Sequence, residues 1–103
     1  MKMAIYYLTC ANDWEADKII KVLLKKRLIA CAKKSLVTST FLWKGNINEE
    51  SECKLVMESV AKNFDKINKE VKKLHSYETY VLYSISVNQT TKEVEGWLKK
   101  ELK

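Results

Sequence analysis

Residues 27–60 read RLIACAKKSLVTSTFLWKGNINEESECKLVMESV, and this stretch decides how the chain is expected to fold. At its centre Gly45 and Asn46 separate two apolar segments. Gly and Asn tolerate the positive φ angles that tight hairpin turns demand. The upstream arm, residues 29–43, is rich in β-branched and aromatic residues, and the downstream arm, residues 47–60, interleaves apolar side chains with charges. The pattern predicts a long β-hairpin.

This hairpin is too long for the helix expected after it. Each arm would span roughly 45 Å at about 3.3 Å per residue. The helix predicted over Lys62–Leu74 would span only about 20 Å at about 1.5 Å per residue. The part left uncovered includes Phe41, Leu42 and Trp43. We therefore expect an assembly in which another chain covers these side chains.

The flanking segments predict an alternation of strands and helices. Lys2–Thr9 contains an unbroken apolar run with aromatics, which is typical of a central strand buried on both faces. Asn12 is placed to cap a helix, with Glu15 three residues on, and apolar residues then recur at helical spacing. Within Val81–Val87, every second residue is a large apolar one, which predicts a strand with one strongly apolar face. Apolar residues at helical spacing from Val94 to Leu102 predict a last helix.

The resulting order is β-α-β-β-α-β followed by a C-terminal helix. This order predicts an α+β, ferredoxin-like split β-α-β sandwich with a long hairpin at its centre. The 103 residues contain no proline, linker, short-period repeat or low-complexity tract. We therefore expect a single domain over residues 1–103.

Composition points to a soluble, cytoplasmic protein. No stretch approaches the roughly 20 apolar residues of a membrane span, and the N-terminus lacks a signal-peptide layout. Cys10, Cys31 and Cys53 are an odd set without paired spacing, which suits reduced thiols. The net charge of +6 raises the question of nucleic acid or acidic lipid, but only one of the 19 basic residues is the Arg preferred for phosphate and base contacts. We expect a solvated lysine surface and no nucleic-acid partner.

No catalytic constellation stands out in the sequence. There is no G-x-G-x-x-G motif, Walker loop or Cys-x-x-Cys pair. Cys31 and the only histidine, His75, could approach each other as nucleophile and base, but no third residue to orient them is evident. An RNA-recognition module shares this strand order, yet its aromatic and glycine signature is missing. We expect no enzymatic activity.

Soft and borderline metal ligands form the remaining candidate set. Thiolate and imidazole together suit copper or zinc, and a carboxylate could complete the coordination shell. Cys31 lies at the entry of the hairpin, and His75, Tyr77 and Glu78 lie in the connection after the second helix. A buried structural cysteine and a histidine that closes a helix would leave the same pattern. The residues alone leave both interpretations open.

Several segments resemble the CutA family of divalent-cation tolerance proteins over essentially the full length of the chain. They are Arg27–Ala32, Phe41–Glu52 and His75–Glu78, and the opening Leu8–Glu15 and the closing Trp97-Leu98 fit the same order. The resemblance implies a ferredoxin-like subunit in a tight homotrimer held by the extended hairpins, similar to the PII signalling proteins. It also implies a role in tolerance of copper and other divalent metals, with no established reaction.

The resemblance also assigns site residues by position. Cys31 matches the family cysteine, and His75, Tyr77 and Glu78 match the family's His-Pro-Tyr-Glu segment. It implies Cys31, His75 and Glu78 as metal ligands. Tyr77 and Trp43, which matches the hairpin tip, would support them in the pocket.

The chain departs from the family pattern at five positions. Ser76 and Tyr80 stand where prolines are usual, Lys33 replaces a common Asn, Glu58 replaces a common Lys, and Ser59 replaces a Thr. Lys33 and Glu58 belong to the pocket that the resemblance implies between subunits. Because both substitutions change its charge, trimerisation is better supported than a shared anionic ligand.

Two functions follow from these observations. The first is a homotrimer that takes part in copper tolerance or response and binds copper, zinc or other divalent cations near its inter-subunit clefts. The second is a PII-like signalling or scaffold trimer that acts through an unidentified protein partner, with metal incidental. A third, an enzyme acting on an acidic metabolite in the inter-subunit pocket, has no acid–base pair to support it.

Overall fold

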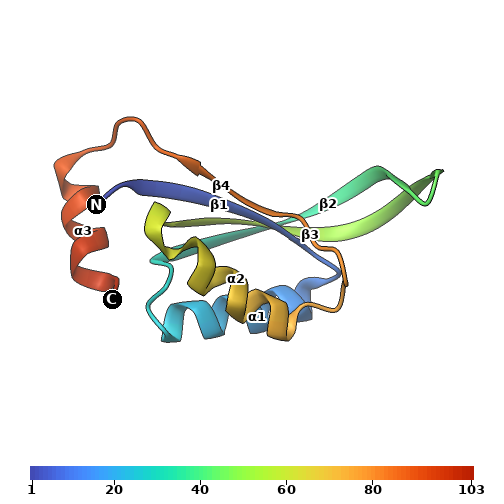
Figure 1. The fold of residues 1–103 in the computed structure, drawn as a ribbon, viewed down its shortest axis with the longest axis horizontal. Helices are drawn as coiled ribbons and strands as arrows, with labels where there is room; N and C mark the ends of the chain where they lie inside the picture. Colours follow the sequence, from blue (N-terminus) through green and yellow to red (C-terminus); the bar gives the residue numbers. More distant parts are fainter.

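The computed structural model describes residues 1–103 as a four-stranded sheet with helices packed on one of its faces (Figure 1). The elements in chain order are β1 (Met3–Cys10), α1 (Asp13–Lys25), β2 (Cys31–Trp43), β3 (Asn46–Val60), the 3-10 turn η1 (Ala61–Asn63), α2 (Phe64–Leu74), β4 (Leu82–Ser86) and α3 (Lys92–Glu101). The strand order is β2-β3-β1-β4, and all three pairings are antiparallel. The predicted ferredoxin-like fold, with its additional C-terminal helix, is confirmed.

The core lies between the sheet and the two central helices. Alternate residues of β1 face the helices and are buried, whereas the residues between them are half-buried on the opposite face. The main core side chains are Ala4, Tyr6, Leu8, Ala16, Ile19, Leu23, Leu55, Met57, Ile67 and Val71. The prediction that β1 is buried on both faces is therefore wrong for the single subunit, because no element of this chain covers the second face. We call that second face the helix-free face.

The hairpin of β2 and β3 extends beyond the rest of the sheet, as predicted (Figure 1). β1 stops pairing with β3 at Cys10 opposite Cys53, but β2 and β3 stay paired as far as Trp43 opposite Asn46. The unsupported ribbon is about 20 Å long at the usual rise of a strand. Leu42 and Ile47 near its end are 74% and 77% exposed. These apolar side chains have no cover within the subunit.

The turn at the end of the hairpin lies one residue earlier than predicted. The positive φ angles belong to Lys44 at 52° and Gly45 at 81°, and Asn46 already belongs to β3. Two central residues with positive φ make the twist of the turn match the twist of the strands. The predicted Gly45-Asn46 turn is therefore wrong by one position, because the pairing of Trp43 with Asn46 fixes the two residues between them as the turn.

β4 presents its apolar face to the side of the sheet that lacks helices. Val81, which directly precedes β4, is 57% exposed, and Tyr83 and Ile85 of β4 are 48% and 53% exposed, whereas Leu82 packs against the core. The cause is register, because Ile85 pairs with Ile5 of β1, and directly paired residues share a face. The helix-free face therefore carries a continuous group of apolar side chains. None of the helices is both long and apolar enough to cross a membrane.

Candidate functional site

The predicted site residues Cys31 and His75 belong to two separate groups, which lie on opposite faces of the sheet and at different positions along β1. The first, which we call the Cys31 group, consists of Cys31, Lys33 and Glu58. Cys31 begins β2 opposite Glu58 in register. Lys33 Nζ lies 3.0 and 3.1 Å from the two carboxylate oxygens of Glu58 and 3.7 Å from Cys31 Sγ. All three side chains lie on the helix-free face, since Glu58 also pairs with Ile5.

Cys31 is not an activated thiolate in the isolated subunit. Burial raises the pKa of its thiol, and the neighbouring Glu58 carboxylate raises it further, while Lys33 acts in the opposite direction. The hydrogen bond to Glu58 in turn raises the pKa of Lys33. The Lys33 side chain is 63% exposed, so its ion pair with Glu58 contributes little to stability. The group is a half-exposed, charged cluster around a protonated thiol.

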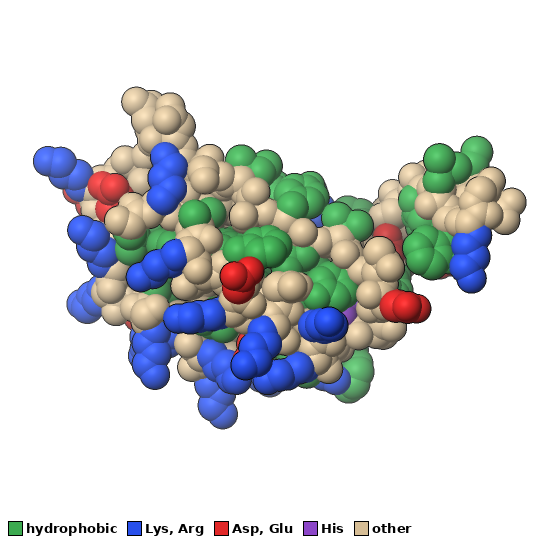
Figure 2. All heavy atoms as spheres, viewed as in Figure 1, with side chains coloured by type: hydrophobic (Ala, Val, Ile, Leu, Met, Phe, Trp, Pro, Cys, Tyr) green, Lys and Arg blue, Asp and Glu red, His purple; other side chains and the backbone are tan.

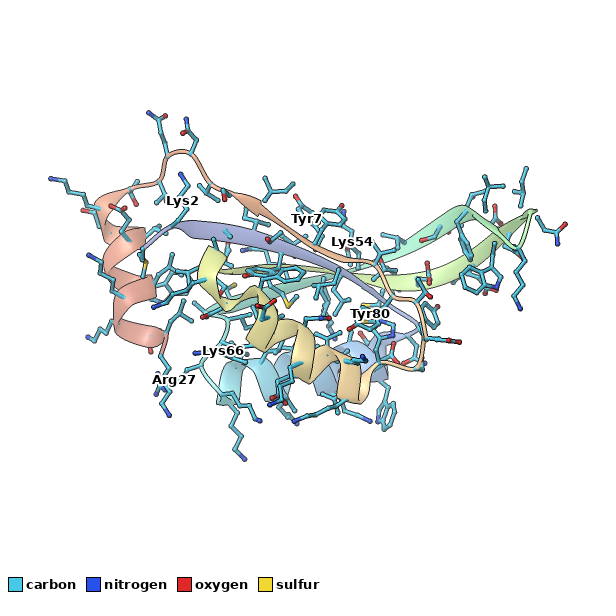
Figure 3. All side chains as sticks on the ribbon, in the orientation of Figure 1. Lys2, Tyr7, Arg27, Lys54, Lys66 and Tyr80 are labelled. Atoms are coloured by element: carbon cyan, nitrogen blue, oxygen red, sulfur yellow. The ribbon has the colours of Figure 1, made fainter.

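The second group surrounds His75, which closes α2. His75 Nε2 lies 2.8 Å from the carbonyl oxygen of Thr9, and Nδ1 accepts a hydrogen bond of 3.1 Å from the backbone N–H of Tyr77. These partners assign the neutral tautomer with its hydrogen on Nε2. The ring stacks on Tyr80, which Figure 3 labels beside the end of α2, at a centroid distance of 4.9 Å. The His75 side chain is fully buried.

Glu15 lies directly beside His75 and joins two loops. Its Oε2 accepts a hydrogen bond of 2.8 Å from the backbone N–H of Ala11, and its Oε1 accepts one of 2.6 Å from that of Ser76. Glu15 Oε2 also lies 3.6 Å from His75 Nδ1. Burial alone would raise the pKa of Glu15, but the hydrogen bonds from Ala11 and Ser76 outweigh it and lower the pKa. Glu15 is thus a buried carboxylate that remains charged.

Cys10 completes this second group, which we call the His75 group: Cys10, Glu15 and His75. One ligand atom from each residue lies within 4.8 Å of the others. Burial raises the pKa of the Cys10 thiol to about 12, with Glu15 adding to the effect. Sequence reasoning missed Cys10 because it appeared only as the end of a strand. The signal that could have revealed it is its position just before the capping pair Asn12 and Glu15.

Within one subunit the structure does not bring Cys31 and His75 together. Cys31 is aligned with Ile5 through Glu58, whereas His75 contacts Thr9, four residues further along β1. This separation is about 13 Å along the strand, and the two side chains also lie on opposite faces of the sheet. A site that used both residues would need two subunits.

The other predicted pocket residues differ in their surroundings. The Tyr77 hydroxyl donates a hydrogen bond of 2.6 Å to the buried carboxylate of Glu52, and burial together with Glu52 raises the pKa of Tyr77. Glu78 is exposed and takes part in none of the ion pairs or side-chain hydrogen bonds of the chain. Trp43 lies at the hairpin tip, far from His75, and is 49% exposed. Glu52 is a further residue that sequence reasoning missed.

Comparison with known proteins decides the family. The family profile described as "CutA1 divalent ion tolerance protein" matches residues 4–101. The chain belongs to the CutA1 family. The resemblance seen in the sequence is thereby confirmed, and it extends over nearly the whole chain.

Individual CutA1 relatives agree with this assignment. The divalent-cation tolerance protein CutA of Pyrococcus horikoshii is 33% identical over 102 residues, which cover 98% of this chain and 99% of the relative. The corresponding protein of Thermotoga maritima is 31% identical and covers 97% and 99%. The solved structure of the CutA of Archaeoglobus fulgidus, described as periplasmic, has a TM-score of 0.95 at 30% identity, with 98% and 99% of the two chains covered.

The family description indicates a class of function. It names tolerance of divalent ions and does not name a reaction. The His75 group supplies a thiol, a carboxylate and an imidazole, which are donors that divalent cations accept in proteins. Since one similar protein is described as periplasmic, the predicted cytoplasmic location stays a prediction.

Proposed function

We propose that this CutA1 protein acts as a homotrimer in tolerance of, or response to, divalent metal ions, with copper as the first candidate. The observation that carries the proposal is the apolar helix-free face. Tyr83 and Ile85 of β4 are about half exposed there, and Tyr7 stacks on Tyr83 at a centroid distance of 5.2 Å. Figure 3 labels Tyr7 on the side of β1 away from α1 and α2, with Lys54 beside it. Other copies of the chain would remove this surface from water.

The protruding hairpin supports the same assembly. Its apolar end, with Leu42 and Ile47 exposed, is an open two-stranded ribbon. Such a ribbon is marginally stable by itself. Packing the hairpin of each subunit against its neighbours would cover both the ribbon and the helix-free face. In an assembly with closed symmetry, the same surfaces would be covered in every copy.

The proposed assembly would bring metal ligands to the boundaries between subunits. Cys31 lies on the face that other copies would cover, with Lys33 and Glu58 beside it. We propose Cys31, His75 and Glu78 as ligands in clefts between subunits, with Tyr77 and Trp43 at their margins. Because Cys31 and His75 lie apart in one subunit, each such cleft would combine residues from two copies. Cu(I) would favour the thiolate, and Cu(II) would favour imidazole and oxygen.

Native mass spectrometry of metal-stripped protein tests both parts of the proposal. A trimer that takes up one copper per subunit, in reducing or in oxidising buffer, is the expected result. Cys31→Ser and His75→Ala should each weaken copper uptake at least tenfold, and Ser39→Ala on the hairpin should not. A monomer would contradict the assembly, and unchanged titrations in both ligand variants would remove the proposed ligands.

The exposed hairpin tip favours a second function, that of a PII-like signalling or scaffold trimer acting through a protein partner. Leu42, Trp43 and Ile47 form an apolar tip of the kind that partners bind. Copper and zinc would then be incidental. A trimer that binds neither metal at stoichiometric levels would favour this function over metal tolerance. The cytoplasm is the compartment we propose for either function, and free thiols at all three cysteines are consistent with it.

A further inference from the structure

Lysine side chains gather on the outer side of the helix layer, and Figure 2 shows them over α1 and α2. Residues three or four positions apart share one side of a helix. α1 presents Trp14, Lys18, Lys21 and Lys25 in this way, and η1 with α2 presents Lys62, Lys66, Lys69 and Lys73. All eight side chains are exposed, and we call them together the lysine face.

The two helices hold these side chains on one surface. α1 and α2 lie side by side on the same face of the sheet (Figure 1). Between them, Lys26 Nζ lies 3.1 Å from a carboxylate oxygen of Glu70 on α2. The lysine face is on the side of the subunit opposite the helix-free face. It therefore stays accessible in the proposed homotrimer, which would cover only the helix-free face and the hairpin.

The acidic residues of the helix layer leave most of this positive charge uncompensated. Residues 13–26 and 61–74 together contain nine lysines and five acids. Four of the acids already have partners, which are Lys34 for Asp13 and Asp17, Lys26 and Lys73 for Glu70, and two backbone N–H groups for Glu15. Only Asp65 is left to balance the seven lysines of these segments that take part in no ion pair, which are Lys18, Lys21, Lys25, Lys62, Lys66, Lys69 and Lys72.

Large apolar side chains lie among these lysines. Trp14 is 70% exposed at the start of α1, and Leu24, directly before Lys25, is 41% exposed. Lys18 Nζ lies 4.3 Å from the centroid of the Trp14 ring, so the indole is held beside a positive charge. Tryptophan and leucine beside lysine are typical of helices that lie at a membrane surface.

We propose that the lysine face binds the surface of an anionic phospholipid bilayer. Each lysine near such a surface strengthens binding about fivefold, and a face of unpaired lysines adds many such contributions. The apolar stripes of α1 and α2 are already packed in the core. The attraction is therefore mainly electrostatic, and Trp14 is the side chain that enters the headgroup region. This inference goes beyond the proposed function, since the contact needs no metal ion.

The composition of the face favours a bilayer over nucleic acid. Neither α1 nor α2 contains an arginine, the residue preferred for two-pronged contacts with phosphates and bases. Lysine acts as a compact point charge, which suits attraction to a fluid surface of many negative headgroups. The sequence predicted only a solvated lysine surface, because it does not show which acids are engaged by partners elsewhere in the fold.

Cosedimentation of the wild-type protein with lipid vesicles tests the proposal. We expect binding to vesicles of phosphatidylcholine and phosphatidylserine in equal parts, and none to vesicles of phosphatidylcholine alone. Added salt should release the protein, because the screening length falls from about 10 Å at 0.1 M salt to about 3 Å at 1 M. Failure to bind the anionic vesicles at low salt would overturn the inference.

Paired variants locate the contact on the molecule. The double variant Lys66→Gln/Lys69→Gln should weaken vesicle binding at least about tenfold, since it removes two lysines of the face. Lys99→Gln/Lys100→Gln is the matched control, because it removes the same charge from exposed positions of α3, outside the lysine face. Equal weakening by both would mean that net charge alone attracts the protein. That result, or tighter binding of a mixed-sequence DNA duplex than of the vesicles, would overturn the inference.

Tryptophan fluorescence identifies which end of the subunit meets the lipid. We expect the emission of the wild-type protein to shift to shorter wavelength on addition of anionic vesicles, because the Trp14 indole leaves water. The shift should be lost in Trp14→Phe and retained in Trp43→Phe, a control at the hairpin tip where the tryptophan is 49% exposed. The reverse pattern would place the hairpin tip in the bilayer and would overturn the inference.

Discussion

The Cys31 group and the His75 group each contain a thiol and a carboxylate, yet the fold treats them in opposite ways. In the His75 group both oxygens of Glu15 and both ring nitrogens of His75 have backbone partners, and the side chains are buried. In the Cys31 group the carboxylate of Glu58 is held by a lysine that is 63% exposed. One group is completed within the chain, and the other lies on the helix-free face, which no element of this chain covers. The same residue types are therefore enclosed in one place and left half-exposed in the other.

The largest effect is expected from a charge placed on the helix-free face. Ile85→Asp should abolish the proposed trimer, because an unpaired charge buried at a subunit boundary would cost about 3–5 kcal/mol per copy. Sedimentation equilibrium would measure this. Leu24→Asp is the matched control, since Leu24 is an exposed apolar residue of α1, at 41%, on the helix side. A trimer that persists with Ile85→Asp would show that this face is not the interface.

The next largest effect should be a difference in stability between variants of the two carboxylates, Glu15 and Glu58. Glu15→Ala leaves the buried N–H groups of Ala11 and Ser76 without partners, and each such group costs about 1–3 kcal/mol. We expect a loss of about 2–5 kcal/mol in the free energy of unfolding, measured by urea denaturation of metal-free protein. Glu58→Ala should cost less than about 1 kcal/mol, because it removes only a largely exposed ion pair. Equal losses would mean that the two groups do not differ as described.

The pH dependence of stability should also show that Glu15 is a buried carboxylate that stays charged in the folded protein. The folded-state pKa of Glu15 is lowered, so its contribution is fully present above the pKa of an unfolded glutamate, about 4.3, and is lost as the pH falls through the lower folded-state pKa. Urea midpoints measured from about pH 6 down to about pH 3 should therefore fall more steeply for the wild type than for Glu15→Gln. Parallel curves would show that Glu15 is not the titrating group.

The smallest effect concerns the hairpin, the other region whose apolar side chains are exposed. Lys44→Gly should raise the free energy of unfolding by up to about 1 kcal/mol, because Lys44 has a positive φ that glycine adopts without a Cβ clash. Asn46→Gly, in the adjacent strand, should lower stability by a similar amount. Thermal unfolding would measure both changes. A loss of stability in Lys44→Gly would mean that the lysine side chain contributes more than the turn geometry does.

Local patterns were sufficient for most of the fold. The hairpin, the helices and the capping role of Asn12 were predicted, and the Asn12 side chain does accept a hydrogen bond of 2.9 Å from the N–H of Glu15. These features depend on neighbouring residues, and so a single sequence displays them. The exact turn residues were missed, since they depend on the register between two arms that are paired over their full length.

The candidate site was predictable only in part. The sequence singled out His75 and Cys31 by residue type, but it could not show that they lie on opposite faces of the sheet. It also paired Glu15 with Asn12 at the start of a helix, whereas the folded chain uses the Glu15 side chain to hold Ser76, 61 residues away. Cys10 and Glu52 were overlooked because nothing near them in the chain marks them as ligands or acceptors.

By itself the sequence determined the order of elements, the long hairpin and the family, because these depend on periodicity, turn chemistry and motifs that are local along the chain. Only the tertiary structure decided which face of β4 stays uncovered and which donors meet at His75. Both depend on strand register, and a shift of one residue would exchange the two faces of the sheet. Long-range pairing, and not residue type, therefore decides which donor side chains meet and which apolar face stays uncovered.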